Sequence, residues 1–281
     1  MKVLLRRVWY ALWALNAYIG KTVSLDIPQR VTVLMTYYHP ARMNHIDLQV
    51  RNILKCAFVE KVVVSNHNPD VRIEDKANVR NQRVVYINQP ARRACGYRWR
   101  VASALNAEYL VVVDDDILLL PSQLKTLFQQ LILAPQVPHG FSGVVYVGND
   151  QFEFRQRENI EVQYLCEVYA VTQDHVKRYS EMERLIVERD ETLRDTVERY
   201  GDFVVISQTG AQNPRIHKVS RLFRADTFKT HGVANHKDEE FDSSMLQVSR
   251  AVERIRSQRL AQPVDAGTVA TAQLDPGEQP A

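Results

Sequence analysis

Three adjacent aspartates, Asp114, Asp115 and Asp116, follow an apolar run and are the residues of this sequence best suited to chemistry. Carboxylates this close repel one another, so a positive charge must compensate them. Alternate side chains of an extended segment point the same way, which predicts that Asp114 and Asp116 share one target while Asp115 faces elsewhere. Oxygen ligands at this spacing suit Mg²⁺ or Mn²⁺. The alternatives are a solvated acidic turn, or N-caps for a helix predicted to begin near Pro121.

The segment in front of the aspartates determines where they lie in the fold. Residues 108–113 (EYLVVV) are apolar and rich in β-branched residues, which predicts a short buried strand. Such a strand delivers the aspartates to the carboxyl edge of a sheet. In open α/β sheets ligands bind at that edge.

Further alternation of strand-like and helix-like segments predicts a doubly wound α/β domain. The predicted strands are residues 31–36, 61–66, 83–88, 108–113, 140–147, 162–171 and 224–229. The predicted helices are a segment from residue 44 onward, then residues 92–106, 121–133, 174–199 and 239–259. Gly201 is predicted to end the charged helical run as a C-cap, and Asp202 to start a short apolar segment.

Composition sets broad bounds on function. The chain has 281 residues, of which 45% are hydrophobic and 25% charged, as is normal for a globular protein. A net charge of +3 is compatible with anionic substrates or a membrane surface but too weak to imply nucleic acid. The three cysteines have no zinc-site spacing and are odd in number, which favours reduced thiols and a cytoplasmic location.

Residues 1–25 are predicted to form an amphipathic helix at a membrane interface. The apolar stretch from Val8 to Ile19 follows basic residues and is too short to span a bilayer. Helical spacing places one apolar stripe on it, made of Leu5, Val8, Trp9, Leu12, Leu15 and Ile19. This pattern predicts peripheral contact of residues 1–20 with the cytoplasmic face of a membrane. The alternative is that the helix packs on the domain or on a partner subunit.

The order of several short motifs resembles that of nucleotide-sugar-dependent glycosyltransferases of the GT-A fold. The resemblance is greatest to the exostosin C-terminal-domain group (family 64-like) and more distant to the inverting family 2. It covers about residues 30–235 and is carried by VTVLMTYY, VVVSN, INQ, RACGYRWRVASAL, VVVDDDI, GDFVVIS and THG. It implies a Rossmann-like, mostly parallel sheet flanked by helices.

The resemblance also implies a domain layout. A single GT-A domain is expected over residues 26–258, with a nucleotide-binding half at about 26–118 and an acceptor-binding half at 119–258. Residues 259–281 are rich in Ala, Pro, Gly and Gln, and this composition predicts a disordered tail.

A donor site follows from the same resemblance. The donor is expected to be a nucleoside-diphosphate sugar, with a UDP-sugar favoured, and the expected contacts are Thr36, Tyr37, Asn66, Asn88, Arg93, Arg98, Asp114 and Asp115. Arginine suits a diphosphate because its donors are bidentate. Mn²⁺ or Mg²⁺ is expected on Asp116 and Asp114, with His231 of the Thr230-His231-Gly232 segment as a further ligand. A metal there stabilises the charge that grows on the leaving diphosphate.

Asp202 is the residue expected to act on the acceptor. Inverting enzymes of this fold carry a carboxylate at a helix start that takes the proton from the attacking hydroxyl. Retaining exostosin-like enzymes have an acidic pair there, which Gly201-Asp202 replaces, so the stereochemical outcome stays open. The alternative for Asp202 is a helix N-cap.

Taken together, the resemblance predicts a metal-dependent glycosyltransferase of the hexosyl-transferring type that uses an acceptor hydroxyl. A lipid-linked or envelope glycan is the expected acceptor because of the amphipathic N-terminus. Two alternatives stay open: a non-catalytic, membrane-associated scaffold, and a carboxylate- or metal-dependent hydrolase that uses Asp116 with Asp202. An aspartate phosphatase is disfavoured because its nucleophile follows the first strand, whereas these aspartates follow the fourth.

Overall fold

The computed structural model describes residues 2–225, 227 and 235–261 of the chain. His231, the predicted further metal ligand, lies outside the described residues. So do most of the strand predicted at 224–229 and nearly all of the predicted tail.

An eight-stranded sheet organises the molecule, with the order β3-β2-β1-β4-β11-β6-β12-β9. Its first four strands are parallel, as predicted, and are β1 (Val31–Tyr37), β2 (Val59–Asn66), β3 (Val84–Asn88) and β4 (Tyr109–Asp114). The remaining strands are β11 (Val168–Thr172), β6 (His139–Gly140), β12 (Arg215–Ile216) and β9 (Ile160–Glu161). β11 runs antiparallel to β4, so the sheet is mixed.

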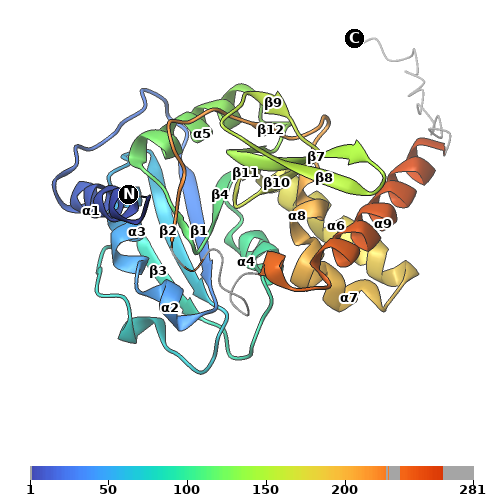
Figure 1. The fold of residues 1–281 in the computed structure, drawn as a ribbon, viewed down its shortest axis with the longest axis horizontal. Coiled ribbons are helices and arrows are strands. Elements are labelled where there is room, and N and C mark those ends of the chain that lie inside the picture. The colour runs from blue at the N-terminus through green and yellow to red at the C-terminus, as the bar shows by residue number, and fades with distance from the viewer. Residues whose placement is uncertain (1, 226, 228–234, 262–281) are drawn as a thin grey trace, which may run out of the picture.

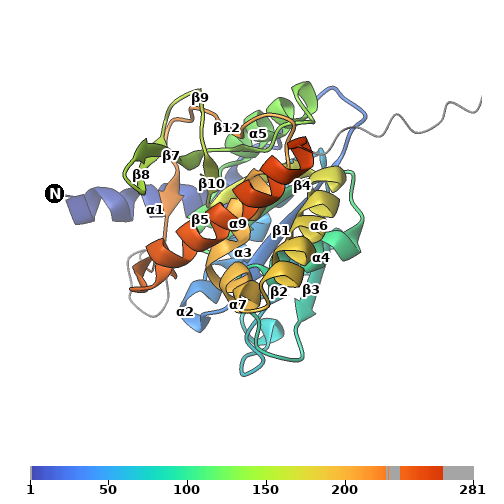
Figure 2. The same ribbon diagram turned by 90° about the vertical axis from the view of Figure 1, so that its right-hand side faces the viewer.

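Each face of the sheet has its own hydrophobic core because alternate side chains of a strand point to opposite faces. In β4, Val111 and Val113 pack into one core, and Leu110 and Val112 into the other. The first core is covered by α3 (Ile46–Leu54) and α5 (Pro121–Leu133), and the second by α4 (Tyr97–Leu105), α6 (Gln173–Arg189), α8 (Asp202–Ser207) and α9 (Phe241–Ala261). Figure 1 shows the two helical layers on either side of the central strands, and Figure 2 shows α6 and α9 across the second layer.

Shorter elements complete the fold. One small sheet has the order β10-β7-β8 and another pairs β13 with β5. Their bounds are β5 (Ile117–Leu118), β7 (Ser142–Gly148), β8 (Gln151–Gln156), β10 (Tyr164–Cys166) and β13 (Phe223–Arg224). The short helical segments are α2 (Pro40–Met43), Ile73–Asp75, α7 (Leu193–Thr196), Val197–Gly201 and Asn235–Lys237.

Several predicted elements differ from the structure. The strand predicted at 140–147 and the helix predicted at 174–199 are each divided into shorter elements. The strand predicted at 162–171 is broken at Glu167, whose φ of 70° is incompatible with a continuous strand. The helix predicted at 92–106 begins only at Tyr97, because backbone N–H groups before it bind other segments: Arg93 donates to the His67 carbonyl (3.1 Å) and Gly96 to that of Glu198 (2.7 Å). Gly201 does not end a helix, since the backbone stays helical from α7 into α8.

At the N-terminus, α1 (Lys2–Ile19) is helical as predicted and packs beside α3. Figure 2 shows its first turns projecting from the body of the molecule. Among the helices of the described residues, none is long and apolar enough to cross a membrane.

Candidate functional site

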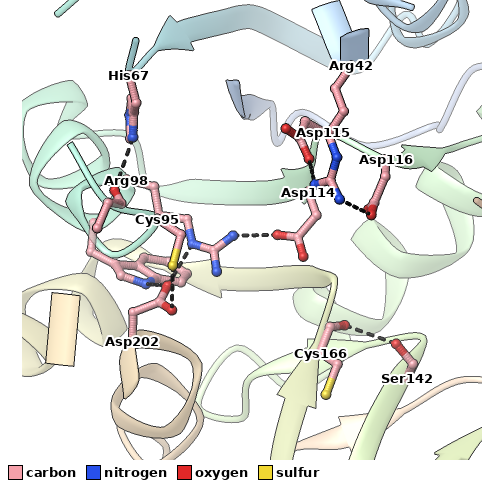
Figure 3. A network of polar contacts seen from close by, with 12 residues as sticks. Arg42, His67, Cys95, Arg98, Asp114, Asp115, Asp116, Ser142, Cys166 and Asp202 are labelled. Atoms are coloured by element: carbon pink, nitrogen blue, oxygen red, sulfur yellow. Dashed lines mark hydrogen bonds and ion pairs between the residues drawn. The ribbon is translucent and has the colours of Figure 1, made fainter. Parts of the chain in front are cut away.

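Asp114, Asp115 and Asp116, here termed the carboxylate turn, lie at the carboxyl edge of β4. Asp114 is the last residue of the strand, while Asp115 and Asp116 form the turn into β5. The strand alternation therefore stops at Asp114, and in the ion pairs of the structure Asp116 shares its partner with Asp115 rather than with Asp114. Asp115 and Asp116 both bind Arg42, whereas Asp114 points to Arg98 (Figure 3).

Arg42 is the first cation of the carboxylate turn, and the sequence analysis missed it. It lies on α2, just after β1, and is 8% exposed. One nitrogen pairs with Asp115, and Nη2 lies 3.1 Å from Asp116 Oδ2. The signal in the sequence was a basic residue soon after the first strand, at the same edge of the sheet as the aspartates.

Arg98, the second cation, links the carboxylate turn to the acceptor-site candidate Asp202. Its guanidinium pairs with Asp114, and Nε lies 2.7 Å from Asp202 Oδ2. The Trp99 indole donates to the same oxygen (2.9 Å), and the Cys95 thiol to Oδ1 (3.6 Å). Figure 3 shows the Arg98 and Cys95 side chains directed to Asp202.

Asp202 is 1% exposed, and both of its carboxylate oxygens bind groups of the protein. The N-cap alternative is wrong, because Asp202 is the first residue inside α8 and its side chain is directed to Arg98. A general base must reach the proton that it removes. In this structure Asp202 is instead arranged to hold Arg98 in place.

The carboxylate turn carries more negative charge than its arginines compensate. Arg42 and Arg98 are the ion-pair partners of four carboxylates, those of the turn and of Asp202. Burial raises the pKa of Asp114 to about 6, although Arg98 opposes the shift. Burial and the neighbouring Asp115 raise the pKa of Asp116 well above its ordinary value. An added cation would relieve this repulsion.

A second charged group faces the turn from the neighbouring strand. Glu167, at the break between β10 and β11, is 7% exposed and has a left-handed backbone. Its carboxylate pairs with Arg224, whose Nη2 lies 2.7 Å from Oε2, and accepts from the Ser142 hydroxyl (2.5 Å). Its charge also contributes to the raised pKa of Asp116. The sequence signal was a single acidic residue inside an otherwise apolar predicted strand.

His236 is a further histidine near this group. Burial lowers its pKa, and the charges of Glu167, Arg42 and Arg224 also act on that pKa. Sequence reasoning favoured His231 because His236 lies in a charged segment.

The predicted donor-site residues of β1 are less accessible than expected. Thr36 is half-buried and lies in register with Asp114. Tyr37 is fully buried, and its hydroxyl donates to Gln49 within the core. The exposed aromatic ring at this edge is that of Tyr38, 39% exposed, whose hydroxyl accepts from Arg92 Nη1 (2.6 Å).

Asn66 and Asn88 hold the loop that follows β2. The Asn66 amide donates to Asn88 Oδ1 (3.1 Å), and Asn88 donates to Glu74 (2.9 Å). Arg93, also predicted at the donor site, stacks over the Tyr97 ring at 4.6 Å. These residues lie at the carboxyl edge but make contacts that shape loops.

His67, which follows β2, was not predicted. It is 2% exposed, donates from Nδ1 to the Ala94 carbonyl (3.1 Å), and its Nε2 has no hydrogen-bond partner among the described residues. Burial lowers its pKa to about 4, so the ring is neutral and Nε2 is an acceptor.

Donor chemistry and charge at the carboxylate turn fit a hard divalent cation. Within the described residues no group of three histidine, cysteine or acidic side chains is arranged to hold a metal. Mg²⁺ is commonly bound through one or two carboxylates, with waters and substrate phosphates as the other ligands. Asp116 and Asp114 could supply these two carboxylates.

Comparison with known proteins identifies the fold but no family. No family model matches the sequence, and no curated protein matches it. GalNAc-T7 with UDP, GalNAc and Mn²⁺ is structurally similar, with a TM-score of 0.50, 9% identity and coverage of 80% of this chain. This chain spans about half of that one, 48%. CMP:2-keto-3-deoxy-manno-octonic acid synthetase complexed with CTP aligns at a TM-score of 0.45 and 13% identity, over 78% of this chain and 99% of that one. The likeness to the GalNAc-T7 structure concerns the fold alone, which is an α/β fold of the GT-A type, as predicted.

Proposed function

We propose that this protein is a metal-dependent glycosyltransferase that moves a sugar from a nucleoside-diphosphate sugar to an acceptor hydroxyl. The carboxylate turn carries the proposal: buried, undercompensated carboxylates lie at the edge of the sheet where ligands of α/β folds bind. A UDP-sugar is the favoured donor, by analogy with the UDP and Mn²⁺ of the GalNAc-T7 structure.

In this proposal Asp116 and Asp114 hold Mn²⁺ or Mg²⁺. When bound, the cation neutralises the charge that develops on the leaving diphosphate. Arg42 keeps Asp115 and Asp116 together, and Arg98, fixed by Asp202, orients Asp114. Asp202 is thus a positioning residue in our account.

The nucleotide is proposed to lie over the ends of β1 and β2. Tyr38 offers an exposed ring for stacking, with Arg92 beside it. Thr36 lies deeper, next to Asp114. The buried Tyr37 supports the wall of the site from the core.

Glu167 is our candidate for the carboxylate that faces the transferred sugar or the acceptor hydroxyl. A non-glycine residue in the left-handed region costs on the order of 1–2 kcal/mol, and such strain often persists at functional sites. Arg224 and Ser142 hold its carboxylate in one orientation. We propose a lipid-linked or envelope glycan as acceptor, on the cytoplasmic side of a membrane, because the N-terminal helix α1 is amphipathic.

One observation favours a second candidate, a non-catalytic scaffold. Arg42 already binds two of the three aspartates, and no three-ligand metal group is present in the described part of the chain. A hydrolase that uses Asp116 with Asp202 has less support, because Asp202 is almost inaccessible to solvent.

Calorimetric titration with UDP and with GDP, each in Mn²⁺ and in EDTA, tests the proposal. We expect Mn²⁺-dependent binding of one nucleotide, lost in Asp116→Ala. Asp174→Ala is the matched control, since that aspartate lies on α6 with its side chain 76% exposed. A folded protein that binds neither nucleotide under any condition would favour the scaffold.

A further inference from the structure

The N-terminal helix α1 is fixed to the domain by only one of its faces. Trp13 is 1% exposed and donates from Nε1 to the Leu119 carbonyl (3.0 Å). Asn16 donates to Asn52 Oδ1 (2.6 Å), and Ala17 is buried. This face contains a tryptophan and polar groups, and α1 lies against α3 through it.

The neighbouring face of α1 is apolar and open. Val8, Leu12, Leu15 and Ile19, here termed the apolar stripe, are 47%, 49%, 49% and 73% exposed. Their spacing of four, three and four residues places them along one side of the helix. Trp9 was predicted to belong to the stripe but lies against Phe223, with ring centroids 5.6 Å apart. Packing of α1 on the domain therefore leaves most of the predicted stripe uncovered.

Basic residues around the apolar stripe indicate the kind of surface that would bind it. Residues 1–25 contain Lys2, Arg6, Arg7 and Lys21 and no acidic residue. Arg7 and Lys21 are exposed at the two ends of the stripe, and the Arg51 guanidinium of α3 lies 5.3 Å from the centroid of the exposed Tyr18 ring. Apolar and basic groups in this arrangement match an anionic lipid surface, with acyl chains below and phosphates above.

We propose that α1 docks the protein onto an anionic bilayer surface through the apolar stripe. Because a docked α1 is also bound to the domain, docking orients the rest of the molecule. Leu119, which accepts from Trp13, is three residues beyond Asp116, and Phe223 of β13 pairs with β5 directly after the carboxylate turn. The proposed lipid contact does not depend on the proposed function. The idea that this contact presents a membrane-borne acceptor to the site does rest on the proposed function.

Vesicle flotation of the full chain tests the docking. Wild type and Leu12→Asp/Leu15→Asp are mixed with vesicles of phosphatidylcholine alone and of phosphatidylcholine with phosphatidylglycerol. We expect wild type to float with anionic vesicles, and the double variant to lose at least about tenfold in partitioning, because each buried leucine contributes strongly to apolar transfer. Leu133→Asp is the matched control, since Leu133 is 76% exposed on α5, and it should float like wild type.

A second variant tests the docking if the double-aspartate variant does not fold. Arg7→Glu/Lys21→Glu changes only exposed charges and should weaken binding to anionic vesicles. Wild type that floats with neither vesicle, or a double-aspartate variant that floats as well as wild type, overturns the proposal. A third outcome is that wild type is a dimer, the double-aspartate variant is a monomer, and neither binds vesicles. This result would overturn the proposal and assign the apolar stripe to contact with a second copy of the chain. The UDP affinity of the same variants should equal that of wild type if only the docking is lost. A loss of docking can therefore be distinguished from a failure of the proposed function.

Discussion

The carboxylate turn and a pair of histidines, His139 and His217, are two desolvated polar groups with opposite outcomes. His139 donates from Nε2 to the Ala134 carbonyl (3.0 Å), so its Nδ1 accepts from His217 Nε2 (2.9 Å). Burial lowers the pKa of both rings, that of His217 to about 4, and each stays neutral. In the carboxylate turn the buried groups are acids, and burial together with the neighbouring carboxylates raises the pKa of Asp114 and of Asp116.

This difference separates a structural polar group from a candidate site. Both ring nitrogens of His139 have hydrogen-bond partners, and the neutral pair has no excess charge for a ligand to compensate. The carboxylate turn is left with excess negative charge that an added cation would reduce. Perturbed acids at the ligand-binding edge of a sheet are a physical reason to expect function there.

The largest effect is expected from removing a cation of the turn. Arg98→Ala leaves the buried Asp202 and the half-buried Asp114 without their shared partner. Breaking a buried pair in this way costs about 3–5 kcal/mol. Urea denaturation should show this loss, whereas Arg184→Ala, which breaks an exposed i,i+4 pair with Glu188, should cost about 0.5 kcal/mol or less. A loss below about 1 kcal/mol for Arg98→Ala would mean that Asp202 does not depend on it.

Acid should weaken the histidine region over a defined pH range. The pKa of His175 and of His217 is about 4 in the folded protein, against an ordinary value of 6.5. Their contribution to stability is complete above pH 6.5 and is lost as pH falls toward 4, because only the unfolded chain takes up the protons. Each fully neutral histidine adds a slope of about 1.4 kcal/mol per pH unit, and less for His217, which is partly exposed.

Urea unfolding at pH 7.5, 6 and 5 checks this slope. His217→Gln should flatten it, since one titrating group is removed. The raised pKa of Asp114, about 6, acts in the opposite direction, because the folded state then holds the extra proton. A stability that rises on acidification would show that the carboxylate turn outweighs the histidines.

The smallest effect is expected from relieving repulsion within the turn. Asp116→Asn replaces a buried acid whose ionised form is disfavoured by burial and by Asp115, so the metal-free protein should gain about 1 kcal/mol. Thermal unfolding in EDTA measures the gain. A loss of similar size would instead mean that the contact with Arg42, 3.1 Å, outweighs the repulsion from Asp115.

The parallel half of the fold was predictable because its strands are continuous apolar runs with distinct ends. β1, β2, β3 and β4 lie within a few residues of their predictions, and the aspartates lie at the predicted edge. The other half of the sheet was harder, since β6, β12 and β9 have only two residues each and are defined by long-range pairing. No local pattern marks strands of that length.

The partners of the aspartates could not be predicted for a similar reason. Arg42 and Asp115 are 73 residues apart, and Arg98 and Asp202 are 104 apart. The sequence indicates that a cation is needed but not which arginine folds against the turn. It also cannot show that Tyr37 points into the core while its neighbour Tyr38 is exposed.

Binding of Mn²⁺, followed by its electron paramagnetic resonance signal with and without UDP, shows whether the carboxylate turn binds a cation together with a diphosphate. We expect that wild type removes free Mn²⁺ from solution, that UDP increases this binding, and that Asp116→Asn abolishes the increase. The control Asp174→Ala should behave as wild type. Mn²⁺ binding that UDP does not change, or that survives in Asp116→Asn, would contradict the assignment of the carboxylate turn as the site of a cation and a diphosphate.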